Sequence, residues 1–133
     1  MLEPADQLAI RRLADLYGYL IDNRMFSRMG EVFTDDVVYD VSDFGHGVQH
    51  GIAAVIAGWR TARHPLSHHA INVLIDEQPD GSAAVIATAI GVGDKGRVGS
   101  VTYHDTAVRT ENGWRLSSRR AVLRRPENIP AES

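Results

Sequence analysis

The sequence predicts a single α+β domain, in which three helices pack on the concave side of a curved antiparallel or mixed sheet and enclose a pocket. Three helical segments and one strand fill the first half of the chain, whereas the second half is typical of four strands. Two turn signals, Asp80-Gly81 and Asn112-Gly113, separate alternating runs and predict hairpins. Because strands and helices do not keep alternating along the chain, a doubly wound parallel sheet is not expected.

The helices are predicted from apolar residues that recur at helical spacing. Residues 5–22 form the longest such segment, and Pro4 suits a first helical turn, where its missing N–H costs nothing. Asn23 is expected to end this helix. Residues 25–33 predict a second, shorter helix and residues 52–59 a third.

The strands are predicted from β-branched and aromatic residues and from the turns between them. VVYDV at 37–41 favours a strand, and the glycine-containing segment 43–51 favours a loop. Four further strands are expected, at 67–75, 83–92, 98–110 and 114–123. Residues 1–125 are expected to form the domain. The polar segment 126–133, with two prolines, is expected to be a flexible tail.

Composition excludes several classes of protein. The 133 residues are 44% apolar, which suits one domain with a real core. The absence of cysteine excludes disulfides and thiolate metal sites. A formal charge of −3 argues against a nucleic-acid partner, and no apolar run approaches the roughly 20 residues of a membrane span. The N-terminus lacks a basic segment followed by a long apolar one, so a cytoplasmic location is expected.

Four motifs, in their order and spacing, resemble the SnoaL-like (nuclear transport factor 2-like) superfamily. They are YGYLID at 17–22, HGIAAVIAGW at 50–59, SHHAIN at 67–72 and YHDTAVRTENGWRLSSR at 103–119. The resemblance implies a cone-shaped fold around a pocket for a small apolar molecule, and a homo-oligomer, dimer or trimer. Relatives of this kind include scytalone dehydratase, ketosteroid isomerase, polyketide cyclases and small subunits of ring-hydroxylating dioxygenases, so polyketide or aromatic metabolism is expected.

Asp22 and His68 are the expected catalytic residues. The resemblance implies that an aspartate at the end of the first helix faces the cavity and orients a histidine. Neighbouring strand residues point to opposite faces, so only one of His68 and His69 can face the cavity. The spacing His68-x-x-x-Asn72 favours His68, while His69 stays open because it shares its face with apolar residues.

An Asp–His pair supports simple proton-transfer chemistry. The carboxylate fixes the tautomer of the imidazole, which takes a proton next to a carbonyl and returns it elsewhere. This suits elimination of water, enol isomerisation or ring closure on a small cyclic or aromatic carbonyl compound. Such a lyase or isomerase needs no metal and no organic cofactor. The pairs His46/His50 and His64/His68 lack the helical context of a zinc site.

Further residues are expected to line or support the pocket, and two other functions stay open. The candidates are Tyr19, Tyr39, Trp59 and Asn72. Scytalone dehydratase has a second catalytic histidine on a strand, and His104 is the candidate for that role here. Ile21 stands where that enzyme has a tyrosine. Asp105 is expected to pair with Arg119 or Arg120 on a solvated sheet face.

The alternatives to an enzyme are a non-catalytic binding or assembly module of the same fold and an oxygenase small-subunit-like protein.

Overall fold

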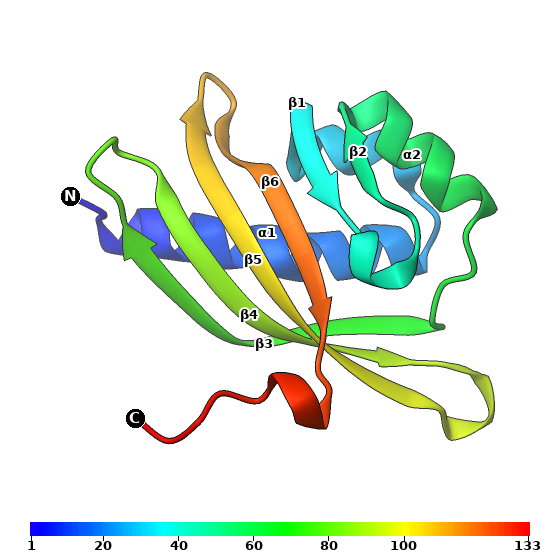
Figure 1. Cartoon of the computed structure of the whole chain (residues 1–133). Helices are drawn as coiled ribbons and strands as arrows, with labels where there is room; N and C mark the ends of the chain where they lie inside the picture. The colour runs from blue at the N-terminus through cyan, green and yellow to red at the C-terminus, as the bar shows by residue number, and fades with distance from the viewer.

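A computed structural model describes all 133 residues as a six-stranded sheet covered by helices on one side (Figure 1). The strands run in the order β2-β1-β6-β5-β4-β3; β1 pairs with β6 in parallel and every other neighbouring pair is antiparallel. The fold class predicted from the sequence is confirmed. The strands are β1 (Phe33–Asp40), β2 (Val48–His50), β3 (Ser67–Glu77), β4 (Ala83–Val92), β5 (Val98–Thr110) and β6 (Gly113–Leu123).

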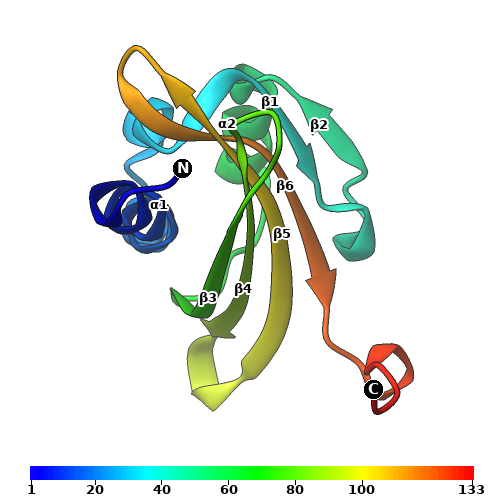
Figure 2. The same cartoon turned by 90° about the vertical axis from the view of Figure 1, so that its left-hand side faces the viewer.

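The long helix α1 (Pro4–Asp22) lies along the concave side of the sheet, and the shorter helix α2 (Ile52–Thr61) covers the end near β1 (Figures 1 and 2). α1 begins as predicted, with Pro4 in its first turn, and ends at Asp22, followed by the cap residue Asn23. Its sheet-facing stripe is buried. The members of this stripe are Ile10, Leu13, Ala14, Tyr17, Gly18, Leu20 and Ile21.

The concave face carries small side chains where the cavity forms. On β4 the buried residues are Ala83, Val85, Ala87 and Ala89, and Ala121 is buried on β6. Of these residues, Ala89 and Ala121 line the cavity, and larger side chains at these two positions would fill part of it. Since a strand places every second residue on one face, this alternation fixes which side chains can face the hollow.

Two segments differ from their prediction. Residues 26–31 form a 3-10 helix in place of the longer helix expected at 25–33, and β1 begins at Phe33, earlier than the predicted strand. The predicted loop at 43–51 contains a short 3-10 helix, Ser42–Phe44, and the strand β2, which pairs with β1. A strand of three residues gives too little alternation to be recognised in a sequence.

The hairpins follow the turn signals. β3 and β4 are joined through the turn at Asp80-Gly81, and β5 and β6 through Glu111-Asn112, with Gly113 at φ 98°, where glycine is favoured. β4 and β5 are joined by the 3-10 turn Asp94–Gly96. After β6, Pro126–Asn128 forms one more 3-10 turn, and the amide of Asn128 donates to the carbonyl of Leu123. None of the helices is long and apolar enough to cross a membrane.

Candidate functional site

A cavity of about 490 Å³ lies between the concave face of the sheet, the C-terminal half of α1 and α2. Its lining is largely apolar and includes Ile21, Val41, Trp59, Val101 and Leu123. Large apolar pockets with a few polar groups are the usual form of small-molecule sites. The polar side chains of this lining are therefore the candidates for catalysis and for binding a ligand.

Asp22 and His68 meet at the edge of this cavity. The Oδ1 atom of Asp22 lies 2.5 Å from Nδ1 of His68, and its Oδ2 atom accepts a hydrogen bond of 2.9 Å from the backbone N–H of His68. Both side chains are largely buried, at 17% and 13% exposure, and His68 lines the cavity. A carboxylate accepts the Nδ1 proton, so the lone pair of the neutral imidazole lies on Nε2, which makes no hydrogen bond within the protein.

The close approach of α1 to β3 brings these two residues together. A Cβ atom placed on Gly18 would lie 2.8 Å from the backbone oxygen of His68. Only glycine permits this spacing, and Asp22 stands one helical turn further along the same side of α1. The ring of Tyr17 contacts the ring of His68 edge to face, with centroids 6.3 Å apart.

Tyrosine hydroxyls form the polar floor of the cavity. The hydroxyl groups of Tyr17 and Tyr39 are hydrogen-bonded at 2.8 Å, and Tyr103 lines the same space. Burial raises the pKa of Tyr17 and of Tyr103, so both hydroxyl groups stay protonated at neutral pH. In the Tyr17–Tyr39 pair one hydroxyl donates to the other, which leaves one O–H free for a ligand oxygen.

The pair Asp105–Arg119 lies in the core, where a solvated sheet face was predicted. Nε and Nη2 of Arg119 each donate to Asp105 at 2.8 Å, and the two side chains are 0% and 3% exposed. Burial opposes the charge on Arg119, but the Asp105 carboxylate and its hydrogen bonds raise the pKa of the guanidinium. Arg119 also lies over the rings of Tyr103 and Tyr17, with its Cζ 3.7 and 4.3 Å from their centroids. Nη1 of Arg119 is buried and has no hydrogen-bond partner.

Of the supporting residues predicted from the sequence, Tyr39 and Trp59 line the cavity and four others do not. Tyr19 is 60% exposed, because it stands on the outer side of α1; the tyrosine that faces the cavity is Tyr17. His69 is exposed and contacts Ser67. Asn72 is exposed, at φ 53°, within an irregularity of β3.

His104 lies on the outer face of the sheet. Its neighbours on β5, Tyr103 and Asp105, are buried. Because successive side chains of a strand point to opposite faces, His104 points away from the cavity. It is opposite Ile86 and Arg120, which are exposed. His104 is therefore not placed to act as a second histidine of this site.

The histidine that stands close to His68 is His64, in the loop between α2 and β3. Its Nε2 donates to the carbonyl of Trp59 at 2.9 Å, and its ring centroid is 6.2 Å from that of His68. Burial lowers the pKa of His64, and the hydrogen bond to the Trp59 carbonyl opposes this effect only in part. Its place in a loop gave no periodic signal in the sequence. No group of three His, Asp or Glu side chains is arranged to hold a metal ion.

A curved sheet with helices on its concave side, enclosing an apolar cavity, defines a cone-shaped protein of the nuclear transport factor 2-like superfamily. The profile of the SnoaL-like domain matches residues 3–120. The chain belongs to this family.

Similar proteins support the same conclusion. An uncharacterized protein of Mycobacterium tuberculosis is 28% identical over 127 residues, which cover 88% of this chain and 84% of that protein. Among solved structures, a proposed aromatic ring hydroxylase from Novosphingobium aromaticivorans has a TM-score of 0.74 at 26% identity, over 95% of this chain and 94% of that one. A proposed scytalone dehydratase from the same organism has a TM-score of 0.70 at 22% identity, over 91% and 85% of the two chains; this likeness concerns the fold.

Proposed function

We propose that the protein is a cofactor-independent lyase or isomerase that moves a proton on a small, apolar, cyclic or aromatic carbonyl compound. The observation that carries the proposal is the contact between Asp22 and His68 at the wall of an apolar cavity. A buried carboxylate bonded to Nδ1 of a histidine, with Nε2 left to the cavity, is the arrangement of a general base.

Proton abstraction is assigned to Nε2 of His68. It takes a proton from the carbon next to the carbonyl group, and the electron pair of the C–H bond moves to form an enolate. Asp22 holds the ring in the tautomer that leaves Nε2 unprotonated and stabilises the imidazolium that forms. Because few water molecules compete inside an apolar cavity, the attraction between carboxylate and imidazolium is stronger there than in water.

The developing enolate oxygen needs a hydrogen-bond donor, and the tyrosine floor of the cavity offers one. Of the paired hydroxyls of Tyr17 and Tyr39, one donates to the other and the second is free to donate to the substrate oxygen. The Arg119 cation beneath the rings of Tyr17 and Tyr103 favours negative charge on this side of the cavity.

The fate of the enolate decides the reaction class. If the imidazolium returns the proton to another carbon, the result is an isomerisation. If the enolate expels a hydroxyl group at the β-carbon and the imidazolium protonates it, the result is loss of water. Both outcomes use the same two residues and balance without an oxidant, a reductant or a metal.

The first step can be tested without knowing the natural substrate. Exchange of the α-protons of α-tetralone and cyclohexanone for deuterium, followed by NMR in D₂O, reports proton abstraction directly. The wild type is expected to accelerate exchange, and His68→Gln to remove most of the acceleration, about 10²–10⁴-fold. Asp22→Asn is expected to reduce the rate strongly, because the amide no longer stabilises the imidazolium.

A matched control separates loss of chemistry from loss of folding. His69→Gln changes the neighbouring, exposed histidine and should exchange at the wild-type rate. If His68→Gln and the wild type exchange these ketones equally, the base is not His68. Binding of a ketone without any exchange would favour the non-catalytic binding module. Light scattering on the purified protein tests the third alternative, since a stable homo-oligomer argues against an oxygenase subunit that requires a larger partner.

A further inference from the structure

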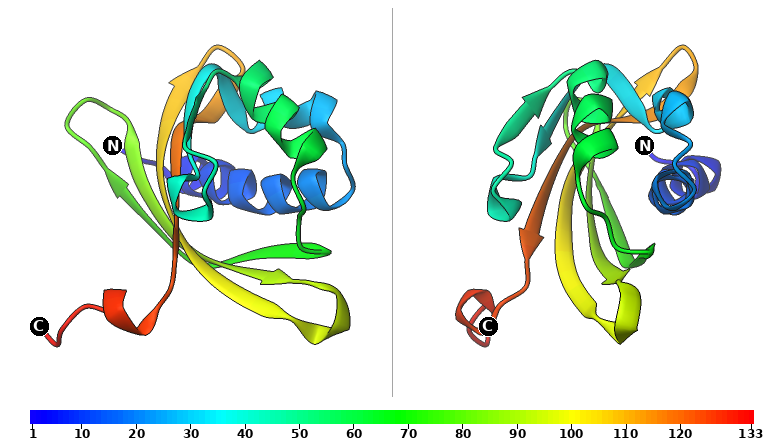
Figure 3. Two further views of the ribbon diagram at one scale, coloured as in Figure 1. Left: turned by 45° about the vertical axis from the view of Figure 1, so that its right-hand side comes forward. Right: turned by 90° about the vertical axis from the view of Figure 1, so that its right-hand side faces the viewer.

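Two arginines lie at the mouth of the cavity, and their side chains form no hydrogen bond or ion pair within the protein. Arg63 follows α2, and Arg97 follows the turn between β4 and β5. Both are exposed, and both line the inner cavity. Figure 3 shows the loop after α2 and the β4–β5 hairpin at the same end of the molecule, so the two arginines come from segments that flank one opening.

A second hollow of about 460 Å³ adjoins the cavity at this point. Seven residues line it, and five of them also line the inner cavity. The shared residues are Arg63, His64, Pro65, Gly93 and Arg97. The two hollows therefore adjoin at a rim that bears two guanidinium groups.

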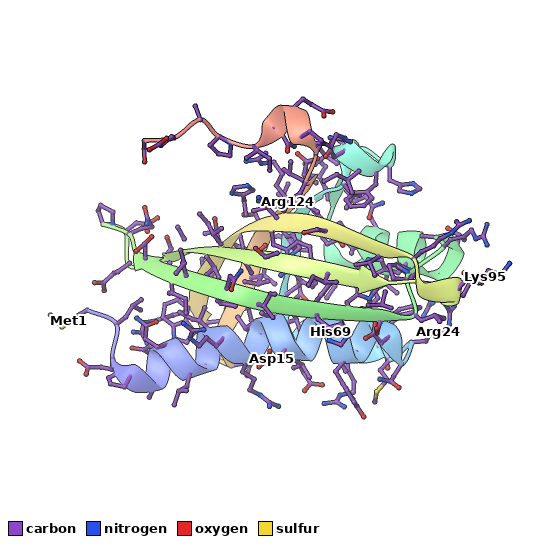
Figure 4. All side chains as sticks on the ribbon, turned by 90° about the horizontal axis from the view of Figure 1, so that it is seen from below. Met1, Asp15, Arg24, His69, Lys95 and Arg124 are labelled. Carbon is purple, nitrogen blue, oxygen red and sulfur yellow. The ribbon has the colours of Figure 1, made fainter.

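Arg63 and Arg97 are the arginines that line the cavity, and neither forms an ion pair. Four other arginines each hold a carboxylate at 3.1 Å or less, namely Arg28, Arg109, Arg119 and Arg125, and the remaining seven are also without an ion pair. The outer hollow contains one acidic residue, Asp94, whose carboxylate forms no ion pair with either arginine. Arg24 and Lys95 lie at the same end of the molecule and add to its positive charge (Figure 4). Because Asp94 is the one acidic residue of the outer hollow, the mouth of the cavity carries an excess of positive charge.

We infer that the substrate is amphiphilic: its apolar ring enters the cavity, while an anionic group, most simply a carboxylate, stays at the mouth between Arg63 and Arg97. A guanidinium presents paired N–H donors that match the two oxygens of a carboxylate. The apolar lining of the interior would accept the ring but not the charge.

One residue of the outer hollow lies close to His68. His64 lines the outer hollow, and its ring centroid is 6.2 Å from that of His68. A compound held at the rim by its acid group can therefore place a ring carbon near Nε2 of His68. His64 is held by the carbonyl of Trp59 and stays neutral at pH 7, because burial lowers its pKa, so the charge at the mouth comes from the arginines. The inference rests on the proposed function only in taking this cavity as the substrate site.

The test compares two compounds that differ only in charge. Naphthoate and naphthamide are titrated by calorimetry into the wild type, Arg63→Gln, Arg97→Gln and the double variant. The wild type is expected to bind naphthoate several-fold more tightly than naphthamide. Each single variant should weaken naphthoate binding about threefold, as for a partly solvated ion pair. The double variant should bind the two compounds alike, and none of the changes should alter naphthamide binding.

Two controls keep the result specific. Arg12→Gln removes an exposed arginine of α1 that does not line the cavity and should leave both affinities unchanged. Raising the ionic strength from about 0.05 to about 0.5 M should reduce the preference for naphthoate in the wild type but not in the double variant. Inorganic phosphate alone should bind weakly, since it lacks the ring.

The outcome is independent of the reaction. Equal binding of the two compounds by the wild type, a preference that survives in the double variant, or no binding of either compound would each overturn the inference. An arginine-dependent preference for naphthoate without ketone exchange would leave the anion site standing and remove the proposed reaction. Exchange that depends on His68, with no preference for the acid, would do the reverse.

Discussion

At the scale of single residues, burial distinguishes the polar groups that form the candidate site. Asp22, His68 and the tyrosine hydroxyls are each held by a specific partner within a water-poor space. The Asp22–His68 pairing was expected from the resemblance to the family, which implied both the aspartate at the helix end and the histidine at the strand start. Tyr17 was missed in favour of Tyr19, because an error of two positions on a helix turns a side chain by about 200°.

The sequence predicted Arg119 as one of two partners for Asp105, but the prediction that this pair lies on a solvated face was wrong for a physical reason. Alternation along a strand shows that residues share a face, but not which face the helices cover. Charged residues favour the assignment to solvent, since few are fully buried. The register between β5 and β6 shifts between Thr106 and Ala107, which also hides the pairing from a simple count.

Removing one member of this pair should destabilise the protein strongly. Asp105→Asn leaves the Arg119 charge in the core without a carboxylate, and we expect the free energy of unfolding to fall by about 3–5 kcal/mol. Urea denaturation followed by circular dichroism measures the change. The double variant Asp105→Leu with Arg119→Met removes both charges and should lose less than Asp105→Asn alone. A double variant that costs as much as Asp105→Asn, or more, would contradict this account.

At the scale of elements, the hairpins and the two α-helices follow from local patterns, whereas their assembly does not. Turn residues at Asp80-Gly81 and Asn112-Gly113 define β3–β4 and β5–β6 because a hairpin depends on nearby residues. The parallel pairing of β1 with β6 joins segments about 80 residues apart, and no local signal encodes it. The cavity depends on that pairing, so its lining could be predicted only in part.

The contact between α1 and β3 rests on Gly18, and a single methyl group should disturb it. Gly18→Ala would place a Cβ atom 2.8 Å from the backbone oxygen of His68, which cannot move without β3. Alanine favours a helix over glycine by about 1 kcal/mol, but overpacking against the sheet costs about 1–3 kcal/mol. We expect net destabilisation in urea and slower ketone exchange, because His68 shifts relative to Asp22.

Gly30→Ala is the matched control for this change. Gly30 lies in the 3-10 helix Phe26–Glu31, and its added Cβ atom would meet nothing within 4 Å. Stability and exchange should stay close to the wild type in this variant. Should Gly18→Ala behave in the same way as Gly30→Ala, the close approach of α1 to β3 would not be what positions His68.

At the scale of the whole molecule, ionisable groups tie the stability of the fold to pH. Asp6 joins the start of α1 to the β5–β6 hairpin, since it accepts hydrogen bonds from Arg109 and from Nε1 of Trp114. These bonds, with that from the backbone of Glu3, lower the pKa of Asp6 below its usual value of about 4. A carboxylate of this kind stabilises the folded state above its unfolded pKa, and this contribution is lost as the pH falls below about 4.

Two partly buried histidines should act in a higher range of pH. Burial lowers the pKa of His64 and of His104, so the unfolded chain takes up protons at these positions before the folded protein does. Their effect on stability is therefore absent above about pH 6.5 and appears as a progressive loss when the pH falls below that value. The unfolding free energy, measured in urea at intervals between about pH 8 and pH 5, should decline more steeply in the wild type than in the double variant His64→Gln with His104→Gln. Equal slopes would mean that the pKa of neither histidine is lower in the folded protein than in the unfolded chain.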